Sequence, residues 1–324
     1  MHSIVFALAV AVPAQPPKPE MPKFDAPVMF NTPEADKILA AMQVFPKDNP
    51  WNEDISKRPV AANSKQMIAG IGAAKRLAYN SDMSFIIVPP DQKKVGVKFT
   101  AYADESDKGP FPIPDNAPIE DWPLNGKDLK SYQREKADAD RHMLVVHPVN
   151  KRLHEFYQAR LTDHGWEVAC AATFDLGSNK LRPDGWTSSD AAGLPVFPAV
   201  VRFDECERGM VGHAMRFTVR RTRRAYVYPA THFASRSNDP NLPRMGERFR
   251  LRADFDVRPF SRHVQAILKG LKKYGMFVAD NGGDWRISVA PDSRIKGLDD
   301  LRKVKGSDFE VIVPTGPNEG PRKK

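Results

Sequence analysis

The chain has 324 residues, a formal net charge of +9 and 29 prolines. Its 41% hydrophobic and 27% charged residues are typical of a globular protein and argue against a disordered or membrane chain. No segment approaches the ~20 consecutive apolar residues that a membrane-spanning helix needs. The positive charge suggests a polyanionic partner, but no nucleic-acid-binding motif accompanies it, so we do not expect nucleic acid.

The N-terminal segment predicts export. Residues 4–12 are apolar, and Val12 and Ala14 suit the positions before a signal-peptidase cleavage site. The segment before them lacks the usual Lys or Arg, so a fortuitous apolar end is the alternative. We therefore expect a signal peptide over residues 1–14 and a secreted, periplasmic or extracellular protein. Residues 15–32 are expected to form a Pro-rich linker, residues 33–313 a single β-rich domain, and residues 314–324 a disordered tail.

Strand patterns outnumber helix patterns along the chain. Four segments have helical features: 34–44, 64–77, 262–274 and 298–304. The expected strands are 84–88, 95–102, 142–146, 153–159, 166–174, 199–203, 213–219, 225–228, 248–257, 276–279, 285–289 and 309–313. Segments 84–88 and 95–102, like 276–279 and 285–289, flank turn sequences typical of hairpins. We therefore predict a mainly β, β-rich α+β fold: an antiparallel β-sandwich or barrel with a few peripheral helices.

Two long, irregular segments, residues 104–123 and residues 178–198, contain carboxylates close to aromatic residues. Sugars stack on aromatic rings while paired carboxyl groups supply acid and base, so the pattern is typical of a glycan site. The alternative is structural, because Asp in turns commonly caps its own backbone. The acidic candidates are Asp104, Glu105, Asp190, Asp204 and Glu205, and Trp186 is the aromatic candidate for substrate binding.

Histidines and arginines supply the remaining candidates. His142, His213 and His232 lie at predicted strand ends, where they could meet as a general base or metal site, although no HxH or HExxH spacing supports a metal. Arg220 and Arg223 suit bidentate binding of carboxylate or sulfate, with Tyr226 beside them, or else form a charged strand edge. No cofactor-binding motif is recognised, and the metal, if any, stays open.

The two cysteines, Cys170 and Cys206, have no zinc-type spacing. In an oxidising compartment they could form one disulfide, and the alternative is two separate buried thiols.

Several stretches together resemble a family of exported bacterial proteins of uncharacterised function: FPKDNPWNEDIS, YADESDKGPFPIP, FDLGSNKLRPDGWTSSDAAGLP, VRFDE, HAMRFTVRRTRRAYVYPATHFAS, DPNLPRMG and LKKYGMFVADNGGDW. The similarity covers residues 44–313, and Cys170 and Cys206 depart from it. Members are often attached to carbohydrate-binding modules, which implies an extracellular polysaccharide setting. The positions that match its signature are Asp104, Glu105, His142, Trp186, Asp190, Asp204, Glu205, His213, Arg220 and His232.

From these features the sequence predicts a secreted polysaccharide-active protein, a glycan hydrolase or lyase. The catalytic candidates are Asp104, Glu105, Asp190, His142 and His213. The substrate-binding candidates are Trp186, Arg220, Arg223, His232 and Tyr226, with an acidic polysaccharide as one possible partner. The alternative is a non-catalytic module that binds glycan or the cell envelope.

Overall fold

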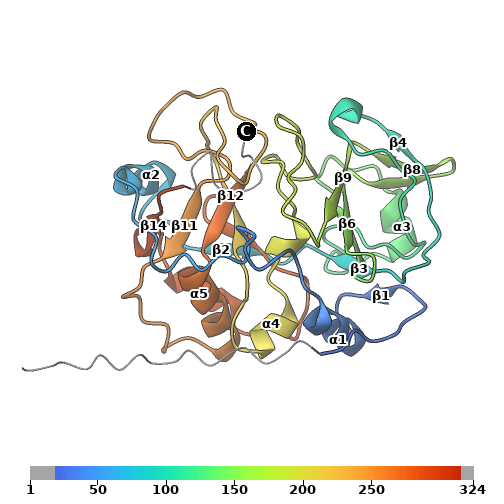
Figure 1. The fold of residues 1–324 in the computed structure, drawn as a ribbon, viewed down its shortest axis with the longest axis horizontal. Helices are drawn as coiled ribbons and strands as arrows, with labels where there is room; N and C mark the ends of the chain where they lie inside the picture. Colours follow the sequence, from blue (N-terminus) through green and yellow to red (C-terminus); the bar gives the residue numbers. More distant parts are fainter. Residues whose placement is uncertain (1–18, 315–324) are drawn as a thin grey trace, which may run out of the picture.

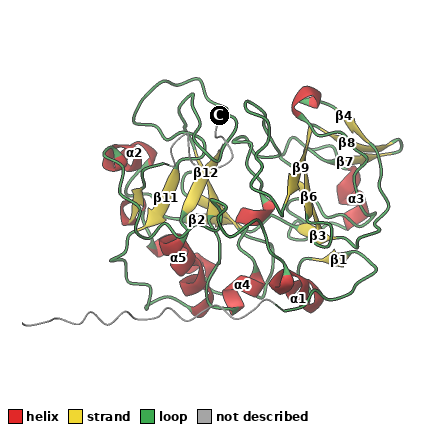
Figure 2. Ribbon diagram, in the orientation of Figure 1, coloured by secondary structure: helices red, strands yellow, loops and turns green. Residues whose placement is uncertain are grey.

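The computed structural model describes residues 19–314 (Figures 1 and 2). Among them, five α-helices are interspersed with strands of three separate sheets, which is a β-rich α+β fold. The helices are α1 (Pro33–Ala41), α2 (Ser64–Ile71), α3 (Leu129–Arg134), α4 (Phe203–Glu207) and α5 (Arg262–Lys273). The predicted signal peptide and most of the predicted tail lie outside the described residues.

A five-stranded sheet forms the right-hand half of the view in Figure 1, in the order β1-β3-β5-β6-β9. The meander predicted over residues 142–174 is confirmed in part, by the antiparallel pairs β5–β6 and β6–β9. The predicted strand 166–174 is divided, because residues 165–168 belong to another sheet. The strand bounds are β1 (Val28–Met29), β3 (Phe85–Ile87), β5 (Met143–His147), β6 (Arg152–Tyr157) and β9 (Cys170–Asp175). Because β1 pairs with β3, the folded region begins within the segment expected to be a linker.

A six-stranded sheet occupies the other half, in the order β14-β11-β12-β10-β13-β2. Its strands are β2 (Ala78–Asn80), β10 (Met215–Val219), β11 (Arg248–Leu251), β12 (Met276–Asn281), β13 (Arg286–Ser288) and β14 (Phe309–Val311). A small third sheet joins β4 (Val97–Phe99), β8 (Gly165–Val168) and β7 (Arg160–Thr162).

The expected antiparallel sandwich or barrel is not confirmed, because all three sheets are mixed and none closes on itself. The two predicted hairpins are wrong for a related reason. Strand β10 lies between β12 and β13, and β3 and β4 belong to different sheets. Turn-like sequence is local, whereas strand pairing depends on which apolar faces pack together.

Three other predicted elements differ from the structure. Residues 197–199 form a 3₁₀ turn and α4 begins at Phe203, so a strand over 199–203 is wrong. The predicted strand 248–257 ends at Leu251 despite its alternating pattern. Segment 298–304 is a 3₁₀ helix over Leu298–Lys303. Cys170 and Cys206 are separate, buried thiols, which is the second of the two alternatives for the cysteines.

Helix α5 follows closely from its sequence. Val264, Ile267, Leu268 and Leu271 recur at helical spacing and are fully buried. Gly275 follows the helix at φ 69°, and a β-carbon there would meet the Phe249 carbonyl oxygen at 2.2 Å. Glycine is therefore required where the chain turns from α5 into β12.

One hydrophobic core extends across both large sheets. It includes Phe85 and Leu144 of the five-stranded sheet and Phe217 and Phe249 of the six-stranded sheet. Phe217 has no exposed surface, and its ring lies 5.1 Å from that of Phe249 and 5.7 Å from that of Trp285. A second core lies between the five-stranded and the small sheet, around Phe111 and Phe156. The shared core holds the facing edges of the two large sheets in a fixed relation.

The substitution Phe217→Ala is expected to lower the free energy of unfolding by about 3–5 kcal/mol, because it leaves a cavity in the core beside the rings of Phe249 and Trp285. Urea denaturation followed by tryptophan fluorescence measures this loss. Leu124→Ala is the control, since Leu124 is 66% exposed and its loss should change stability by less than about 0.5 kcal/mol. A loss near 1 kcal/mol for Phe217→Ala would contradict the tight packing of this core.

Candidate functional site

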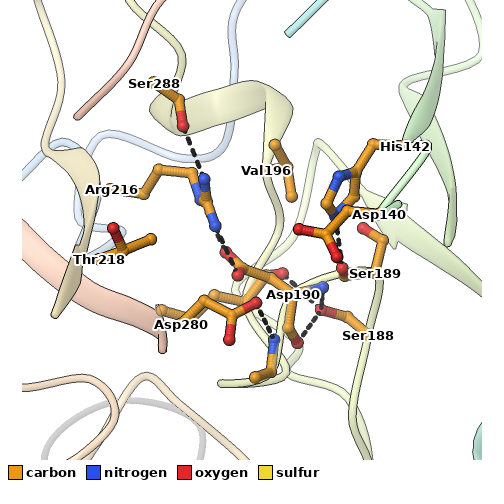
Figure 3. Close-up of polar contacts among 12 residues, drawn as sticks. Asp140, His142, Ser188, Ser189, Asp190, Val196, Arg216, Thr218, Asp280 and Ser288 are labelled. Carbon is orange, nitrogen blue, oxygen red and sulfur yellow. Dashed lines mark hydrogen bonds and ion pairs between the residues drawn. The ribbon is translucent and has the colours of Figure 1, made fainter. Parts of the chain in front are cut away.

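A buried ion pair lies where the two large sheets meet. Arg216 on β10 donates to Asp190 from Nε at 2.9 Å and from Nη2 at 2.7 Å, as Figure 3 shows. Its third nitrogen, Nη1, donates to Ser288 Oγ of β13 at 2.6 Å. The two side chains are 6% and 0% exposed. Burial by itself lowers the pKa of Arg216, but the charge of Asp190 and its hydrogen bonds raise it above the usual value. The pair is therefore charged, geometrically complete and closed to solvent.

The loop that contains Asp190 is held by hydrogen bonds within the loop and by the side chain of Glu155. Ser188 Oγ accepts the Asp190 amide at 2.9 Å, and the Gly193 amide donates to the Asp190 carbonyl at 3.0 Å. Gly193 has φ 71°, and a β-carbon there would meet Thr231 Oγ1 at 2.0 Å. The buried Glu155 of β6 accepts from Ser189 Oγ and from two backbone amides later in the loop. The chain is thus fixed on both sides of Asp190.

Asp280 of β12 lies beside this pair because of a β-bulge. Strands β10 and β12 run in register up to Phe217 and Val278, and then Thr218 pairs with Asp280 instead of Ala279. Since paired residues point to the same face of a sheet, the bulge moves Asp280 from the Val219 face to the Thr218 and Arg216 face. Figure 3 shows its carboxyl group directed toward Asp190.

The Asp280 carboxyl group has an unusual proton affinity. Its pKa is raised to about 7, mainly by burial and also by the charge of Asp190, while Arg216 and the Asn281 amide oppose the shift. Oδ1 accepts the Asn281 amide at 2.6 Å, and Oδ2 lies 3.4 Å from the Ala191 amide. The residue is partly exposed. Asp280 can therefore hold a proton near neutral pH on a residue that is not fully enclosed.

His142 of the segment entering β5 forms a second charged pair. Its Nδ1 lies 2.8 Å from Glu120 Oε2, and its Nε2 lies 2.7 Å from the Ser189 carbonyl oxygen. Two acceptors require both ring nitrogens to donate, as in imidazolium. Burial lowers the pKa of His142, but the charge and hydrogen bond of Glu120 raise it to about 10. His142 therefore has no free lone pair with which to act as a base at neutral pH.

Asp82, between β2 and β3, is a further acid in this region. Burial raises its pKa to about 7, helped by Glu120 and Asp121 and opposed by Arg216. Among the described residues its Oδ1 has no hydrogen-bond partner. We name the six residues Asp82, Glu120, His142, Asp190, Arg216 and Asp280 the acid cluster.

Asp140 and Tyr157 border the cluster on its solvent side. The Tyr157 hydroxyl lies 3.4 Å from Asp140 Oδ1, and its ring centroid lies 5.7 Å from that of His142. Burial, Asp140 and Asp280 raise the pKa of Tyr157 to about 12. Asp140 is exposed, and Tyr157 is partly exposed. These two residues therefore place an exposed carboxyl group and a partly exposed phenol beside the cluster.

Of the five residues predicted to be catalytic, the structure brings Asp190 and His142 together and leaves three elsewhere. Asp104 is exposed in a 3₁₀ turn, and Glu105 accepts the Thr187 amide at 2.8 Å. His213 lies in a separate buried network with Glu205, at 2.9 Å, and Arg202. The pKa of Glu205 is about 2 because Arg202 and His213 outweigh its burial. These contacts hold loops and α4 in place. Catalytic roles for Asp104, Glu105 and His213 stay predictions, because the structure does not bring the three residues into one site.

The predicted substrate-binding residues lie along the loops next to Asp280. His232 Nδ1 contacts the Ala191 carbonyl at 2.8 Å, and the rings of His232, Phe233 and Tyr226 stack in sequence. The Arg182 guanidinium lies over the Trp186 ring, 5.5 Å from the ring centroid. The backbone carbonyl of Trp186 accepts a hydrogen bond from Thr231 Oγ1. Arg220 and Arg223 lie in the loop that follows β10.

Six important residues are absent from the sequence-based set: Asp82, Glu120, Asp140, Tyr157, Arg216 and Asp280. Asp280 follows the buried run 276–279, and a carboxylate at the end of such a strand is the available signal. Arg216 alternates with apolar residues in β10, but its partner is 26 positions away in the chain. That pairing depends on the tertiary fold.

No family model, curated protein or solved structure matches this chain. The resemblance described above therefore stays an expectation. Within residues 19–314 no group of three or more His, Cys, Asp or Glu side chains is arranged to hold a metal ion, and no helix is long and apolar enough to cross a membrane. A groove of about 570 Å³ beside β14 and α2 shares no residue with the acid cluster.

The substitution Asp280→Asn is expected to stabilise the protein at pH 8 by on the order of 2 kcal/mol, and to change it little at pH 4. With its pKa raised to about 7, the native carboxyl group binds more protons than the unfolded one between about pH 4 and 7. Wild-type stability therefore falls as pH rises through this window, and the amide removes that loss. Urea denaturation of wild type and variant at pH 4 and pH 8 measures the change in the free energy of unfolding. An equal change at both pH values would refute the prediction.

Proposed function

We propose that the chain is a secreted glycoside hydrolase that cleaves an extracellular polysaccharide, with Asp280 as the general acid and Asp140 as the second carboxylate. The observation that supports this most directly is a carboxyl group, on a partly exposed residue, whose pKa of about 7 keeps a proton available at neutral pH. Glycoside hydrolysis requires one protonated and one ionised carboxyl group on either side of the bond. Burial is the main cause of the raised pKa of Asp280, and the charge of Asp190 adds to it while Arg216 opposes it.

In this reaction Asp280 gives its proton to the glycosidic oxygen as the bond from that oxygen to the anomeric carbon breaks. Water adds to the anomeric carbon, and its proton passes to Asp140. The products are two shorter glycans, one with a new reducing end. The Tyr157 hydroxyl, which donates to Asp140, orients the carboxylate.

Elimination by a lyase fits these residues less well. A lyase needs a base that removes a proton from carbon, and both Tyr157 and His142 retain their protons at neutral pH. Hydrolysis needs only a weak base for water, which a carboxylate supplies. We therefore favour the hydrolase over the lyase.

The stacked rings of His232, Phe233 and Tyr226 favour a second candidate function, a glycan-binding module without catalysis. Aromatic faces of this kind pack against the apolar faces of sugars. The two functions differ in one result: a binding module holds glycan and releases no new reducing ends. Export itself rests on residues 1–14, which lie outside the described part of the chain.

Asp280→Asn and Asp140→Asn are each expected to lower kcat by at least about 100-fold on the polysaccharide that the wild type cleaves, because each removes a proton-transfer group. Release of reducing ends by the mature protein from a panel of plant, algal and bacterial polysaccharides measures this. Asp138→Asn is the matched control, since Asp138 is an exposed carboxylate in the same loop as Asp140. Undiminished activity in both variants would rule out this mechanism.

The kcat/KM of the wild type is expected to fall about tenfold for each pH unit well above 7. Asp280 must be protonated to act as an acid, and its raised pKa of about 7 sets the start of this decline. A pH profile between 4 and 10 measures it. A rate that stays flat from pH 7 to 10 would show that Asp280 is not the acid.

A further inference from the structure

The arginines of this chain fall into two groups. Most of those in residues 19–314 form ion pairs with carboxylates, including the exposed residues Arg134, Arg252, Arg258 and Arg302. By contrast, the structure gives no carboxylate partner or side-chain hydrogen bond within residues 19–314 to five guanidinium groups in the loop between β10 and β11. We name these the arginine strip: Arg220, Arg221, Arg223, Arg224 and Arg236.

The strip is a fixed feature of the fold. The Arg220 amide donates to Asp284 Oδ1 at 2.7 Å, and the Arg224 amide donates to the Ser237 carbonyl at 2.7 Å. Thr222 Oγ1 lies 2.5 Å from Ser235 Oγ and 3.2 Å from Asn281 Oδ1. These backbone and side-chain hydrogen bonds hold the two halves of the strip together, while within residues 19–314 its guanidinium groups have no carboxylate partner. Arg223 Nε is buried without a hydrogen-bond partner among the described residues.

The strip is continuous with the candidate acid. Asn281, which contacts Thr222, is the residue directly after Asp280. A second connection passes through the aromatic residues. The Ala191 amide faces Asp280, and the Ala191 carbonyl contacts His232. The Arg224 guanidinium lies 5.8 Å from the centre of the neighbouring Phe233 ring. A chain of sugars bound at Asp280 would therefore extend across the stacked rings toward unpaired positive charge.

We propose that the site takes a polyanionic glycan, whose carboxylate or sulfate groups bind the arginine strip while one sugar ring packs on His232 and Phe233. This proposal rests on the proposed function only for the position of the bond that is cleaved. The binding of the glycan does not depend on catalysis. Guanidinium groups bind carboxylate and sulfate through paired N–H donors, and unpaired arginines have no internal partner to give up. The aromatic rings favour a sugar, because a strip for phosphate alone would not need them.

Binding is tested on the full mature chain bearing Asp280→Asn, which holds substrate without cleaving it. The probes are fluorescein-labelled polygalacturonate, chondroitin sulfate, neutral dextran and single-stranded DNA, measured by fluorescence anisotropy at 50–300 mM salt. Arg220, Arg221, Arg223 and Arg224 are changed together to Gln in the test variant. Arg134, Arg252, Arg258 and Arg302 are changed to Gln in the control, so both variants lose the same charge.

The expected result is binding of polygalacturonate or chondroitin sulfate, with at least tenfold weaker affinity and a smaller salt dependence in the test variant only. Binding of polygalacturonate would show that carboxylate groups suffice, whereas binding of chondroitin sulfate alone would assign a role to sulfate, because chondroitin sulfate carries both groups. Equal losses in both variants would reveal nonspecific charge attraction and overturn the proposal. Dextran binding as tight as that of either acidic glycan, DNA binding as tight or tighter, or no binding by any probe would also overturn it.

The two proposals fail separately. Tight, strip-dependent binding of an acidic glycan without reducing-end release by the wild type refutes hydrolysis and leaves this inference standing. Release of reducing ends from neutral glycans alone refutes this inference and leaves hydrolysis standing.

Discussion

The buried pair between Asp190 and Arg216 is the interaction on which the rest of the site depends. It joins the loop after the five-stranded sheet to the middle of the six-stranded sheet, with every nitrogen of the guanidinium group used. Removing either partner would leave an uncompensated charge in the interior, at a cost of about 3–5 kcal/mol. The pair is therefore a structural connection, and its two charges act on Asp280 in opposite directions, Asp190 raising its pKa and Arg216 lowering it.

Charge balance explains which groups of the acid cluster hold protons. His142 neutralises Glu120, and Arg216 neutralises Asp190, so the two cations are already used. Burial makes any further negative charge costly, and both Asp82 and Asp280 respond by binding protons with a pKa of about 7. This arrangement reduces stability at alkaline pH, and such a cost is expected where a side chain is tuned for proton transfer.

Sequence reasoning succeeded where the relevant information was local. The apolar spacing and terminal glycine of α5, the β5-β6-β9 meander and the polar loop around Asp190 all follow from neighbouring residues. It failed where pairing is non-local. Strand β10 separates β12 from β13, and the bulge at Asp280 depends on a neighbour more than 60 positions away. Likewise, His142 appeared to be a possible base until Glu120 and the Ser189 carbonyl showed that both its nitrogens donate.

The sequence by itself determined a β-rich globular chain with excess positive charge, an arginine run after β10 and acidic, aromatic loops, because these depend on composition and short-range pattern. Only the tertiary structure decided which acids meet, which are neutralised and which arginines have no partner. The physical reason is that proton affinity and charge compensation depend on distance and burial in space. Residues 82, 142, 190, 216 and 280 acquire their chemistry from one another, and the folded sheets bring them together.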